Sequence, residues 1–491
     1  MEDRSEENRK LPLNVTDGFR HDPTAFVRED RTVAGATVRA AGLGEPLPGD
    51  AEILAGRIDE LLADQREDGA LSDHELHAVG LTGTVLLELL DLGASSDDPR
   101  IARAVECIIR GPGEEHVGGS MSVYNIHALC RMGLTDAEAL RPSIRWYVEN
   151  AETWIGPHQM CPWTPAVQLQ GLWAARALDE DIEPLVARSL ATIAEGLNAA
   201  GCLGYNDPWG YLGCAALIDH PSARAIAEKQ VAMILRSQRP DGGWGYRSLT
   251  VFRALRRHGL LAPLAEAPPL PADWRVARSI PAPAGELFSM TFDGSSLWVY
   301  DGAAGCAVAV SPRDGGVARR LKLPVEDVRA VGWWDGALAA TWQDAEQAEW
   351  EDNSNARKLL RIDPITGQVK KQLPLVQMHD IAGVAQVGQE LVVADAFLNA
   401  VGIFRPRKPG KPRIRTLGAP GTIHLAAAGG AVWHSDWLLT EILFKSDLDG
   451  RLLEWGTKPF DGDVAGLAHD GRLLWALDAR AGQIHALEKP S

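Results

Sequence analysis

The chain has 491 residues, of which 45% are hydrophobic and 23% are charged, and its formal net charge is −17. This length exceeds one ordinary domain and predicts two or three globular domains. The negative charge argues against nucleic acid or an anionic membrane as the main partner. No stretch approaches the ~20 apolar residues of a membrane span. The charged start MEDRSEENRK lacks a signal-peptide core, and six scattered cysteines indicate free thiols, so we expect a cytoplasmic protein.

The first half of the chain has the apolar spacing of helices. Residues 1–20 are polar, and we expect them to form a loose segment. Over residues 21–262 two kinds of helix alternate: an amphipathic, charged kind such as 98–110, and a kind that is apolar nearly all round, such as 165–178. Outer and inner layers of helices have these two patterns. Six inner and at least five outer helices predict an (α/α)6 toroid over 21–262.

A short glycine turn recurs between these helices. The clearest copy is RSQRPDGGWGYRSL at residues 236–249. Aligning Gly69 with Gly242 gives a second copy, and Gly119 and Gly201 fall into the same register. The copies begin about 40 to 50 residues apart, which is the length of one helical hairpin. The order Gln, spacer, Asp-Gly-Gly-Trp-Gly resembles the QW repeat of the terpenoid cyclase and prenyltransferase toroid family.

The resemblance implies an enzyme of specialised metabolism that binds a hydrophobic small molecule, with isoprenoids among the candidates. The family's class II cyclases protonate an alkene through an Asp-x-Asp-Asp motif, but the alignable residues 207–210 read DPWG, with Trp209 in the acid's place. The chain also lacks an Asp-Asp-x-x-Asp diphosphate site and the Asp-x-Cys of the zinc-dependent prenyltransferases. His158 and Cys161 supply only two zinc ligands. Standard class II chemistry is therefore not expected.

Polar residues form two columns at the starts of the inner helices, where the mouth of a central cavity is expected. Six residues after each turn glycine stand Glu75, Asn125, Asp207 and Ser248, with Thr164 in a looser alignment. Eight residues after it stand His77, His127, Trp209 and Thr250. Helix capping is the alternative interpretation, since Asp, Asn, Ser and Thr are favoured N-caps. We interpret Glu75, His77, His127 and Asp207 as acid and base candidates.

Aromatic residues gather at the same mouth, and their π faces suit a cationic intermediate or substrate. The candidates for binding a substrate are Tyr124, Trp163, Tyr205, Trp209, Tyr246 and Arg247. Aromatic residues also fill toroid cores and stack on sugars. Two alternative functions therefore remain open: a non-catalytic binding or scaffold protein, and a carbohydrate-active, lyase-like toroid. Basic residues that could bind a uronate substrate are scarce at the mouth, where Arg247 is the main one. This scarcity weighs against the carbohydrate-active alternative.

The pattern changes after the toroid. Four prolines over 263–274 predict a stiff linker. Over 275–491 the apolar period becomes 2, and five units repeat an apolar strand, a glycine turn and an apolar strand that ends in Asp. Four strands per unit predict a five-bladed β-propeller that resembles the NHL repeat. The final unit lacks its fourth strand, and residues 275–283 match the fourth-strand pattern, so we expect them to close the ring.

Acidic residues precede the first strand of several propeller units. Glu286, Asp380 and Asp463 share a position 15 residues before the Asp of their unit, with Asp327, His379 and His424 nearby. A rim of carboxylates is a candidate site for a divalent cation; a solvated channel entrance is the alternative. The repeated Asp themselves are expected to form turns: Asp301, Asp344, Asp395, Asp436 and Asp478. The polar insertion in the second unit predicts a surface loop, and the propeller is a candidate surface for a protein partner.

Overall fold

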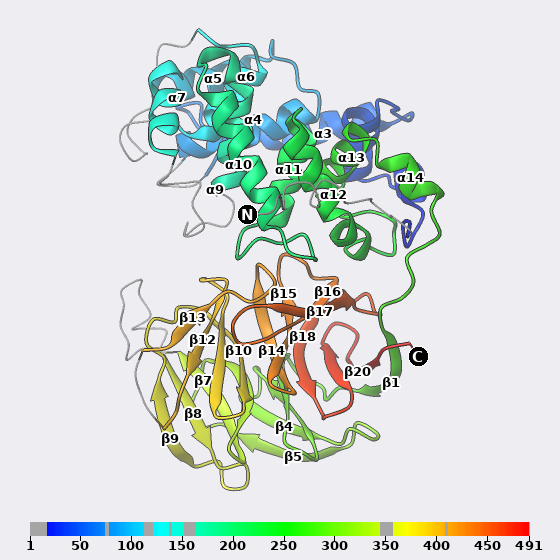
Figure 1. Ribbon diagram of the computed structural model, residues 1–491, viewed down its shortest axis with the longest axis vertical. Coiled ribbons are helices and arrows are strands. Elements are labelled where there is room, and N and C mark those ends of the chain that lie inside the picture. The colour runs from blue at the N-terminus through cyan, green and yellow to red at the C-terminus, as the bar shows by residue number, and fades with distance from the viewer. Residues whose placement is uncertain are drawn as a thin grey trace, which may run out of the picture. The chain divides into compact units, whose positions relative to one another are not determined.

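The computed structural model describes residues 17–73, 78–111, 121–136, 140–151, 164–343, 357–407 and 411–490 (Figure 1). The chain divides into two compact units. The helical unit comprises Met1–Leu197 and Asn206–Pro271, and the propeller unit comprises Asn198–Tyr205 and Ala272–Ser491. Among the described helices, none is long and apolar enough to cross a membrane.

The helical unit contains thirteen α-helices within the described ranges, together with a π-helix and a 3-10 helix. The α-helices are α1 (Pro23–Glu29), α2 (Val33–Thr37), α3 (Asp50–Ala63), α4 (Ala78–Asp91), α5 (Pro99–Arg110), α6 (Val123–Arg131), α7 (Leu140–Glu149), α9 (Thr164–Ala174), α10 (Ile182–Gly196), α11 (Pro208–Leu217), α12 (Pro221–Arg236), α13 (Ser248–Arg257) and α14 (Leu261–Glu266). The π-helix η2 is Val38–Leu43 and the 3-10 helix η4 is Arg176–Leu178.

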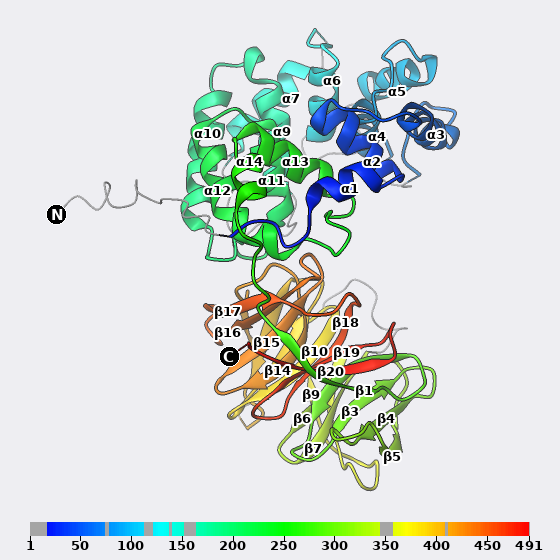
Figure 2. The same ribbon diagram turned by 90° about the vertical axis from the view of Figure 1, so that its right-hand side faces the viewer.

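Two kinds of helix alternate, as the apolar spacing predicts. Helix α5 begins after Asp98, whose side chain accepts a hydrogen bond from the N–H of Arg100. It buries one stripe, formed by Ile101, Ala104 and Ile108. Helix α11 is instead buried on nearly every side. Five helices pack in sequence, α4 on α6, α6 on α9, α9 on α11 and α11 on α13, and α13 packs on η2. Figure 2 shows α1 and α2 close together at the start of the unit.

The turns aligned at Gly69, Gly201 and Gly242 share one backbone geometry. In each turn, the residue three before the glycine accepts a hydrogen bond from the glycine N–H. The same residue donates its own N–H to the carbonyl of the residue after the glycine. The glycines have φ values of 95°, 71° and 87°, a region that glycine adopts without strain. The fourth aligned glycine, Gly119, lies outside the described residues.

The glutamine and tryptophan of the clearest repeat hold their turn in place. Gln238 donates to the carbonyls of Gly242 and His21, both at 2.9 Å, and accepts the N–H of His21 at 3.0 Å. Gln65 likewise donates to the carbonyl of Gly69 at 2.9 Å, so the bond from the glutamine to the turn glycine recurs in the second copy. The indole N–H of Trp244 donates to the carbonyl of Ile234 at 2.8 Å. These bonds fasten each turn to the helix before it.

A buried ion pair fastens the start of the helical unit. Arg39, on η2, and Asp50, at the start of α3, are each 1% exposed. Two guanidinium nitrogens of Arg39 bond the carboxylate oxygens of Asp50, at 2.6 and 2.8 Å. Arg39 also donates to the carbonyls of Val27 and Asp30. One side chain therefore joins the end of α1, η2 and the start of α3.

The proline-rich stretch expected to be a linker over 263–274 begins inside a helix. Leu261–Glu266 forms α14, in which Leu264 is 1% exposed. Pro263 is the third residue of α14. Proline is tolerated in the first turn of a helix because the N–H groups there have no intrahelical acceptor.

The second unit is a five-bladed β-propeller, and this prediction is confirmed. Each blade is an antiparallel sheet of four strands. The strands of blades 1 to 3 are β2 (Leu287–Phe292), β3 (Leu297–Asp301), β4 (Cys306–Val310) and β5 (Val317–Lys322); β6 (Val328–Trp334), β7 (Ala337–Gln343), β8 (Arg357–Ile362) and β9 (Val369–Pro374); β10 (Ile381–Val387), β11 (Glu390–Asp395), β12 (Ala400–Phe404) and β13 (Arg413–Arg415). Blade 4 contains β14 (Thr422–Ala428), β15 (Ala431–Asp436), β16 (Ile442–Ser446) and β17 (Leu452–Thr457).

Blade 5 combines strands from both ends of the propeller sequence. It contains β18 (Val464–His469), β19 (Leu474–Asp478) and β20 (Gln483–Glu488), with β1 (Arg275–Pro281) as its outer strand. Because β1 pairs antiparallel with β20, the strand before blade 1 completes the last blade. The first strands of neighbouring blades contact one another around the whole ring, from β2 through β6, β10, β14 and β18 back to β2.

The repeated Asp at the end of each second strand organises its blade. In blade 3 the carboxylate of Asp395 accepts the N–H groups of His379, Asp380, Phe397 and Leu398. Asp436 does the same in blade 4 with Gly421, Leu438 and Leu439. One carboxylate thus joins the entry to the first strand with the turn to the third, as expected of turn formers. Asp344 lies outside the described residues.

Candidate functional site

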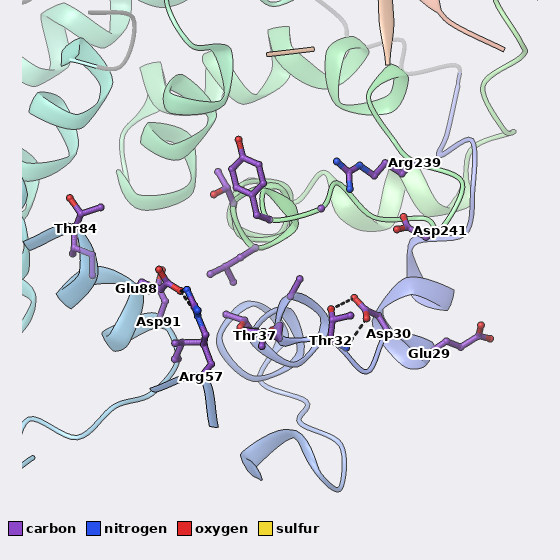
Figure 3. Close-up of a pocket in the computed structure, with 18 of the residues that line it drawn as sticks. Glu29, Asp30, Thr32, Thr37, Arg57, Thr84, Glu88, Asp91, Arg239 and Asp241 are labelled. Carbon is purple, nitrogen blue, oxygen red and sulfur yellow. Dashed lines mark hydrogen bonds and ion pairs between the residues drawn. The ribbon is translucent and has the colours of Figure 1, made fainter. Parts of the chain in front are cut away.

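A cleft of about 1100 Å³ opens in the helical unit (Figure 3). Four segments form it: α1 with α2, Arg57 of α3, one face of α4, and the turn that leads into α13 with the first residues of that helix. Its lining residues are Ala25, Glu29, Asp30, Thr32, Val33, Ala34, Thr37, Arg57, Thr84, Leu87, Glu88, Asp91, Leu92, Arg239, Asp241, Gly245, Tyr246, Leu249 and Thr250. A volume of this order suits a small molecule with an extended apolar part.

The α4 wall is one face of a helix. Thr84, Leu87, Glu88 and Asp91 are spaced by three and four residues, so their side chains leave the same side of α4. Apolar and polar groups alternate down this wall. The opposite wall adds Val33 and other small apolar groups from α2. The cleft therefore has apolar walls with carboxylates among them.

Ion pairs hold the two carboxylates of α4. Glu88 bonds Arg57 at 3.0 Å, and the two side chains point toward one another in Figure 3. Asp91 bonds Arg131 at 2.9 Å and Arg253 at 3.0 Å. Because Arg131 is on α6 and Arg253 on α13, Asp91 joins α4, α6 and α13 at this side of the cleft. Its charge is balanced by two guanidinium groups.

The opposite rim carries an excess of negative charge. Asp30 accepts two hydrogen bonds from Thr32, from its N–H and its hydroxyl, both at 2.8 Å (Figure 3). Asp241 accepts the N–H of Gly243 at 2.8 Å, and Glu29 is exposed at the edge. Among the described residues that line this rim, the cation is Arg239. Three carboxylates beside one guanidinium favour a ligand that carries a positive charge.

The four acid and base candidates from the sequence do not form one described group. Glu75 and His77 lie outside the described residues. His127 lies within α6 and is 6% exposed. Burial, with a smaller contribution from the nearby charge of Arg131, lowers the pKa of His127 to about 4. The imidazole is therefore neutral near neutral pH.

Asp207 is an N-cap. It accepts the N–H of Trp209 at 3.0 Å and precedes Pro208, the first residue of α11. Asn125 of the same column accepts the N–H of Gly83 at 2.8 Å and so joins α6 to α4. Ser248 accepts the N–H of Trp244 at 2.9 Å. Asp207 therefore caps its own helix, whereas Asn125 and Ser248 accept backbone N–H groups from outside their helices.

Three of the six expected binding residues lie together. The guanidinium of Arg247 lies 4.8 Å from the ring centroid of Trp209 and 4.9 Å from that of Tyr246. Trp209 is 7% exposed and Tyr246 is 80% exposed, and Tyr246 also lines the cleft. Of the other three, Tyr124 is half-buried on α6, Tyr205 belongs to the segment counted with the propeller unit, and Trp163 lies outside the described residues.

Most residues of the cleft were not predicted from the sequence. Helix α4 is mostly apolar but carries Thr84, Glu88 and Asp91, and charged residues on such a helix could have indicated a polar opening. Arg239 lies inside the clearest repeat, between its glutamine and its glycines. A Cβ on Gly245 would fall 2.8 Å from a guanidinium nitrogen of Arg239, so this glycine leaves room for the arginine.

The acidic positions of the propeller are exposed. Glu286, Asp380 and Asp463 each stand just before the first strand of a blade. The backbone N–H groups of Glu286 and Asp380 bond the repeated Asp of their blades. Within the described ranges, no group of three or more His, Cys, Asp or Glu residues has the geometry to hold a metal ion. The candidate pair His158 and Cys161 lies outside those ranges.

Comparisons with known proteins concern the propeller. No family model matches the chain, and no curated protein matches it. A glutaminyl cyclase from Myxococcus xanthus is 12% identical over 44% of this chain and 95% of its own, with a TM-score of 0.34. The aldose sugar dehydrogenase from Streptomyces coelicolor is 13% identical over 45% and 99%, with a TM-score of 0.31.

A third similar structure is the β-propeller domain of Cps50 (Swd1) from Myceliophthora thermophila. It is 13% identical over 44% of this chain and 100% of its own, with a TM-score of 0.29. Identities and TM-scores this low carry no argument about the activity of this chain.

Proposed function

We propose that the helical unit is an (α/α)6 toroid whose cleft binds a small amphiphilic molecule with a cationic group. The observation that carries the proposal is the composition of the cleft. Its apolar walls suit a hydrocarbon part, and its lining includes the carboxylates of Glu29, Asp30 and Asp241 together with the guanidinium of Arg239. The 80%-exposed ring of Tyr246 already contacts the guanidinium of Arg247, at 4.9 Å from the ring centroid, so this ring is able to accept a cation.

The ion pairs of the cleft support this choice of charge. Arg57 is already bonded to Glu88 and to Glu60, so its charge is compensated within the protein. Asp91 is likewise compensated by two arginines. On the opposite rim, Glu29, Asp30 and Asp241 form no such ion pair among the described residues, so the charge of that rim is negative. An anionic amphiphile of the same length would meet repulsion there.

A thermal-shift experiment tests the choice of ligand. Decyltrimethylammonium, decyl sulfate and decyl glucoside share one tail and differ in the charge of the head group. Below their micelle concentrations, only the ammonium should raise the melting temperature of the helical unit. A ligand at ten times its dissociation constant stabilises the folded state by about 1.4 kcal/mol. Equal shifts with all three compounds, or a shift with the sulfate alone, would defeat the proposal.

Two variants locate the binding. Leu249→Trp fills the cleft from α13 and should abolish the shift, whereas Leu453→Trp adds the same side chain to the 50%-exposed Leu453 in the propeller and should leave the shift unchanged. Glu29→Gln removes one rim carboxylate and should weaken binding. The exposed Glu266→Gln on α14 removes the same charge outside the cleft and is the matched control.

A cyclase-like enzyme is the second candidate. The observation that favours it is the shared geometry of the glycine turns, which agrees with the resemblance to the terpenoid cyclase and prenyltransferase family. A cation-stabilising cleft would then serve a carbocation formed from an isoprenoid substrate. Acid and base roles would rest on Glu75 and His77, since Asp207 is an N-cap and His127 is buried. Loss of turnover of an isoprenoid substrate in Glu75→Gln, with the fold intact, tests it.

The remaining expectations stay proposals. A carbohydrate-active toroid would need Arg247 for its substrate, and Arg247 is already in contact with two aromatic rings. The propeller is proposed as a surface for a protein partner, and its acidic positions as a site for a divalent cation. The cytoplasmic location is also a proposal.

A further inference from the structure

One histidine breaks the repeat of the propeller. The strand registers of the five blades place one residue of each third strand at the same position, and in four blades it is apolar or glycine: Val308, Leu360, Gly402 and Phe444. In blade 5 the residue at this position is His485, on β20. A histidine in a core position costs desolvation free energy unless its nitrogens have partners. The partners of the two nitrogens of His485 therefore indicate the role of this side chain.

His485 lies between a serine and an aspartate. Its cross-strand partner is Ser279 on β1, whose Oγ lies 2.8 Å from Nδ1 of the imidazole. The other nitrogen, Nε2, lies 3.9 Å from Oδ2 of Asp478. The ring of Phe460 packs 4.7 Å from the imidazole and fixes its orientation. The serine hydroxyl is therefore within hydrogen-bond distance of the imidazole, whereas the carboxylate of Asp478 lies beyond it and acts on the ring through its charge.

The positions of the charges decide the tautomer. Asp478 is 3% exposed and faces Nε2, so its negative charge favours a proton on that nitrogen. Nδ1 then has a free lone pair and accepts the hydroxyl proton of Ser279. Burial lowers the pKa of His485, and the charge of Asp478 raises it by a smaller amount. The imidazole is neutral near neutral pH, as a general base must be.

The serine is accessible and the aspartate is fixed. Ser279 is exposed on β1, which is the outermost strand of its sheet. Asp478 is the repeated Asp of blade 5, and its carboxylate accepts the N–H of Ala481 at 2.9 Å. An edge strand also presents backbone N–H groups that no neighbouring strand uses. Such groups are donors for the oxyanion of an acyl-transfer intermediate.

A second serine–histidine contact in the propeller has a structural role and serves as a comparison for the contact between Ser279 and His485. His434 in blade 4 bonds Thr422 at 3.2 Å and Ser446 at 3.0 Å. All three of these residues are 0% exposed, so no substrate reaches them. Ser279, in contrast, combines a bonded imidazole with an exposed hydroxyl.

We propose that Ser279 is an activated nucleophile for acyl transfer, with His485 as its base and Asp478 as a positioning residue. The substrate class is an ester or thioester. Oγ forms a bond to the acyl carbon, the bond from that carbon to the leaving oxygen or sulfur breaks, and the proton of Oγ passes through His485 to the leaving group. Water then hydrolyses the acyl-serine by the same route. This site is separate from the proposed ligand cleft and does not depend on it.

An alkyl fluorophosphonate tests the site in the full-length protein. Oγ of an activated serine displaces fluoride from phosphorus, and the adduct appears as a single mass increment on the intact protein. We expect one adduct per chain, mapped by peptide mass spectrometry to Ser279. Ser279→Ala should abolish it. Ser295→Ala, which removes another exposed serine of the propeller, should not change it.

Two further variants separate activation from folding. His485→Phe introduces the residue that blade 4 has at this position, so the blade should remain folded, and labelling should slow by at least about 10²-fold. Asp478→Asn keeps an acceptor for the N–H of Ala481 but removes the charge. The pKa of His485 should then fall, which moves the midpoint of the labelling rate against pH to lower pH.

Three results would overturn the proposal. One is the failure of wild-type protein to form the adduct. Another is an adduct that survives Ser279→Ala. The third is labelling of Ser279 at the wild-type rate in His485→Phe, which would make Ser279 an ordinary surface serine. An unchanged melting temperature of the propeller in His485→Phe shows that slower labelling is not unfolding.

Discussion

The ion pair between Arg39 and Asp50 should dominate the stability of the helical unit's first segment. Replacing Arg39 with Met leaves the carboxylate of Asp50 buried with the N–H of Leu47, at 2.7 Å, as its remaining bonded partner. It also removes the donor that bonds the carbonyls of Val27 and Asp30. Breaking a buried pair on one side costs about 3–5 kcal/mol. We therefore expect Arg39→Met to lower the free energy of unfolding by about that amount.

Denaturant unfolding followed by circular dichroism at the helical wavelength measures this change. The double variant Arg39→Met/Asp50→Leu should recover part of the loss, because it leaves no uncompensated charge. Arg224→Met, which breaks an exposed pair with Glu228 on α12, is the control and should cost under about 0.5 kcal/mol. A cost below about 1 kcal/mol for Arg39→Met would refute the reasoning, as would a double variant less stable than both single variants.

The pH dependence gives an independent check. The hydrogen bonds from Arg39 hold the pKa of Asp50 below its ordinary value of 3.8. The stabilisation from the pair is therefore present above that value and is lost as the pH falls through the lower, folded-state pKa. In Arg39→Met burial acts without the guanidinium and raises the pKa of Asp50. The difference in stability between wild type and variant should be largest at neutral pH and shrink toward acid pH.

Three further predictions concern other parts of the fold. Gln238→Leu removes three hydrogen bonds from a residue that is 2% exposed, and we expect a loss of about 2–4 kcal/mol in the unfolding of the helical unit, measured by denaturant. Ile280→Asp buries an unpaired carboxylate on β1, where Ile280 is 2% exposed, and should lower the melting temperature of the propeller; an unchanged value would mean that β1 does not contribute to blade 5. If the acidic positions of the propeller bind a divalent cation, millimolar calcium, magnesium or manganese should raise the melting temperature and Asp380→Asn should remove that rise; an unchanged melting temperature would instead support a solvated channel entrance.

The propeller was predictable because every blade repeats the same sequence pattern. An apolar strand, a glycine turn and a strand that ends in Asp recur with little change, and Asp395 and Asp436 show why. Each carboxylate satisfies several backbone N–H groups at the same point of its blade. A pattern of period 2 also fixes which residues face the neighbouring sheets. The closing role of β1 follows from the missing strand at the other end.

The helical unit was predictable in its turns but less so in its side chains. The alignment of Gly69, Gly201 and Gly242 corresponds to one backbone geometry. The polar column six residues later was interpreted as a catalytic mouth. The first N–H groups of each helix need acceptors, however, and that need accounts for Asp207. Spacing places a residue at a helix start without saying whether it faces a cavity or its own backbone.

The cleft could not be predicted from the periodicity of the sequence. Its walls come from segments as distant in sequence as Glu29, Asp91 and Arg239, and no motif joins them. Each wall is ordinary in isolation: a cap, a charge on an apolar helix, a turn residue. The negative rim exists only because the fold brings these charges to one opening.

The most direct measurement of the central claim is a calorimetric titration of the full-length protein with decyltrimethylammonium below its micelle concentration. We predict one binding site per chain, weaker binding in Glu29→Gln than in Glu266→Gln, and no binding in Leu249→Trp. Binding should also weaken as the ionic strength rises, because the attraction is partly between charges. Equal affinity in wild type and Leu249→Trp, or equal affinity for decyl sulfate, would contradict the claim that this cleft is a site for a cationic amphiphile.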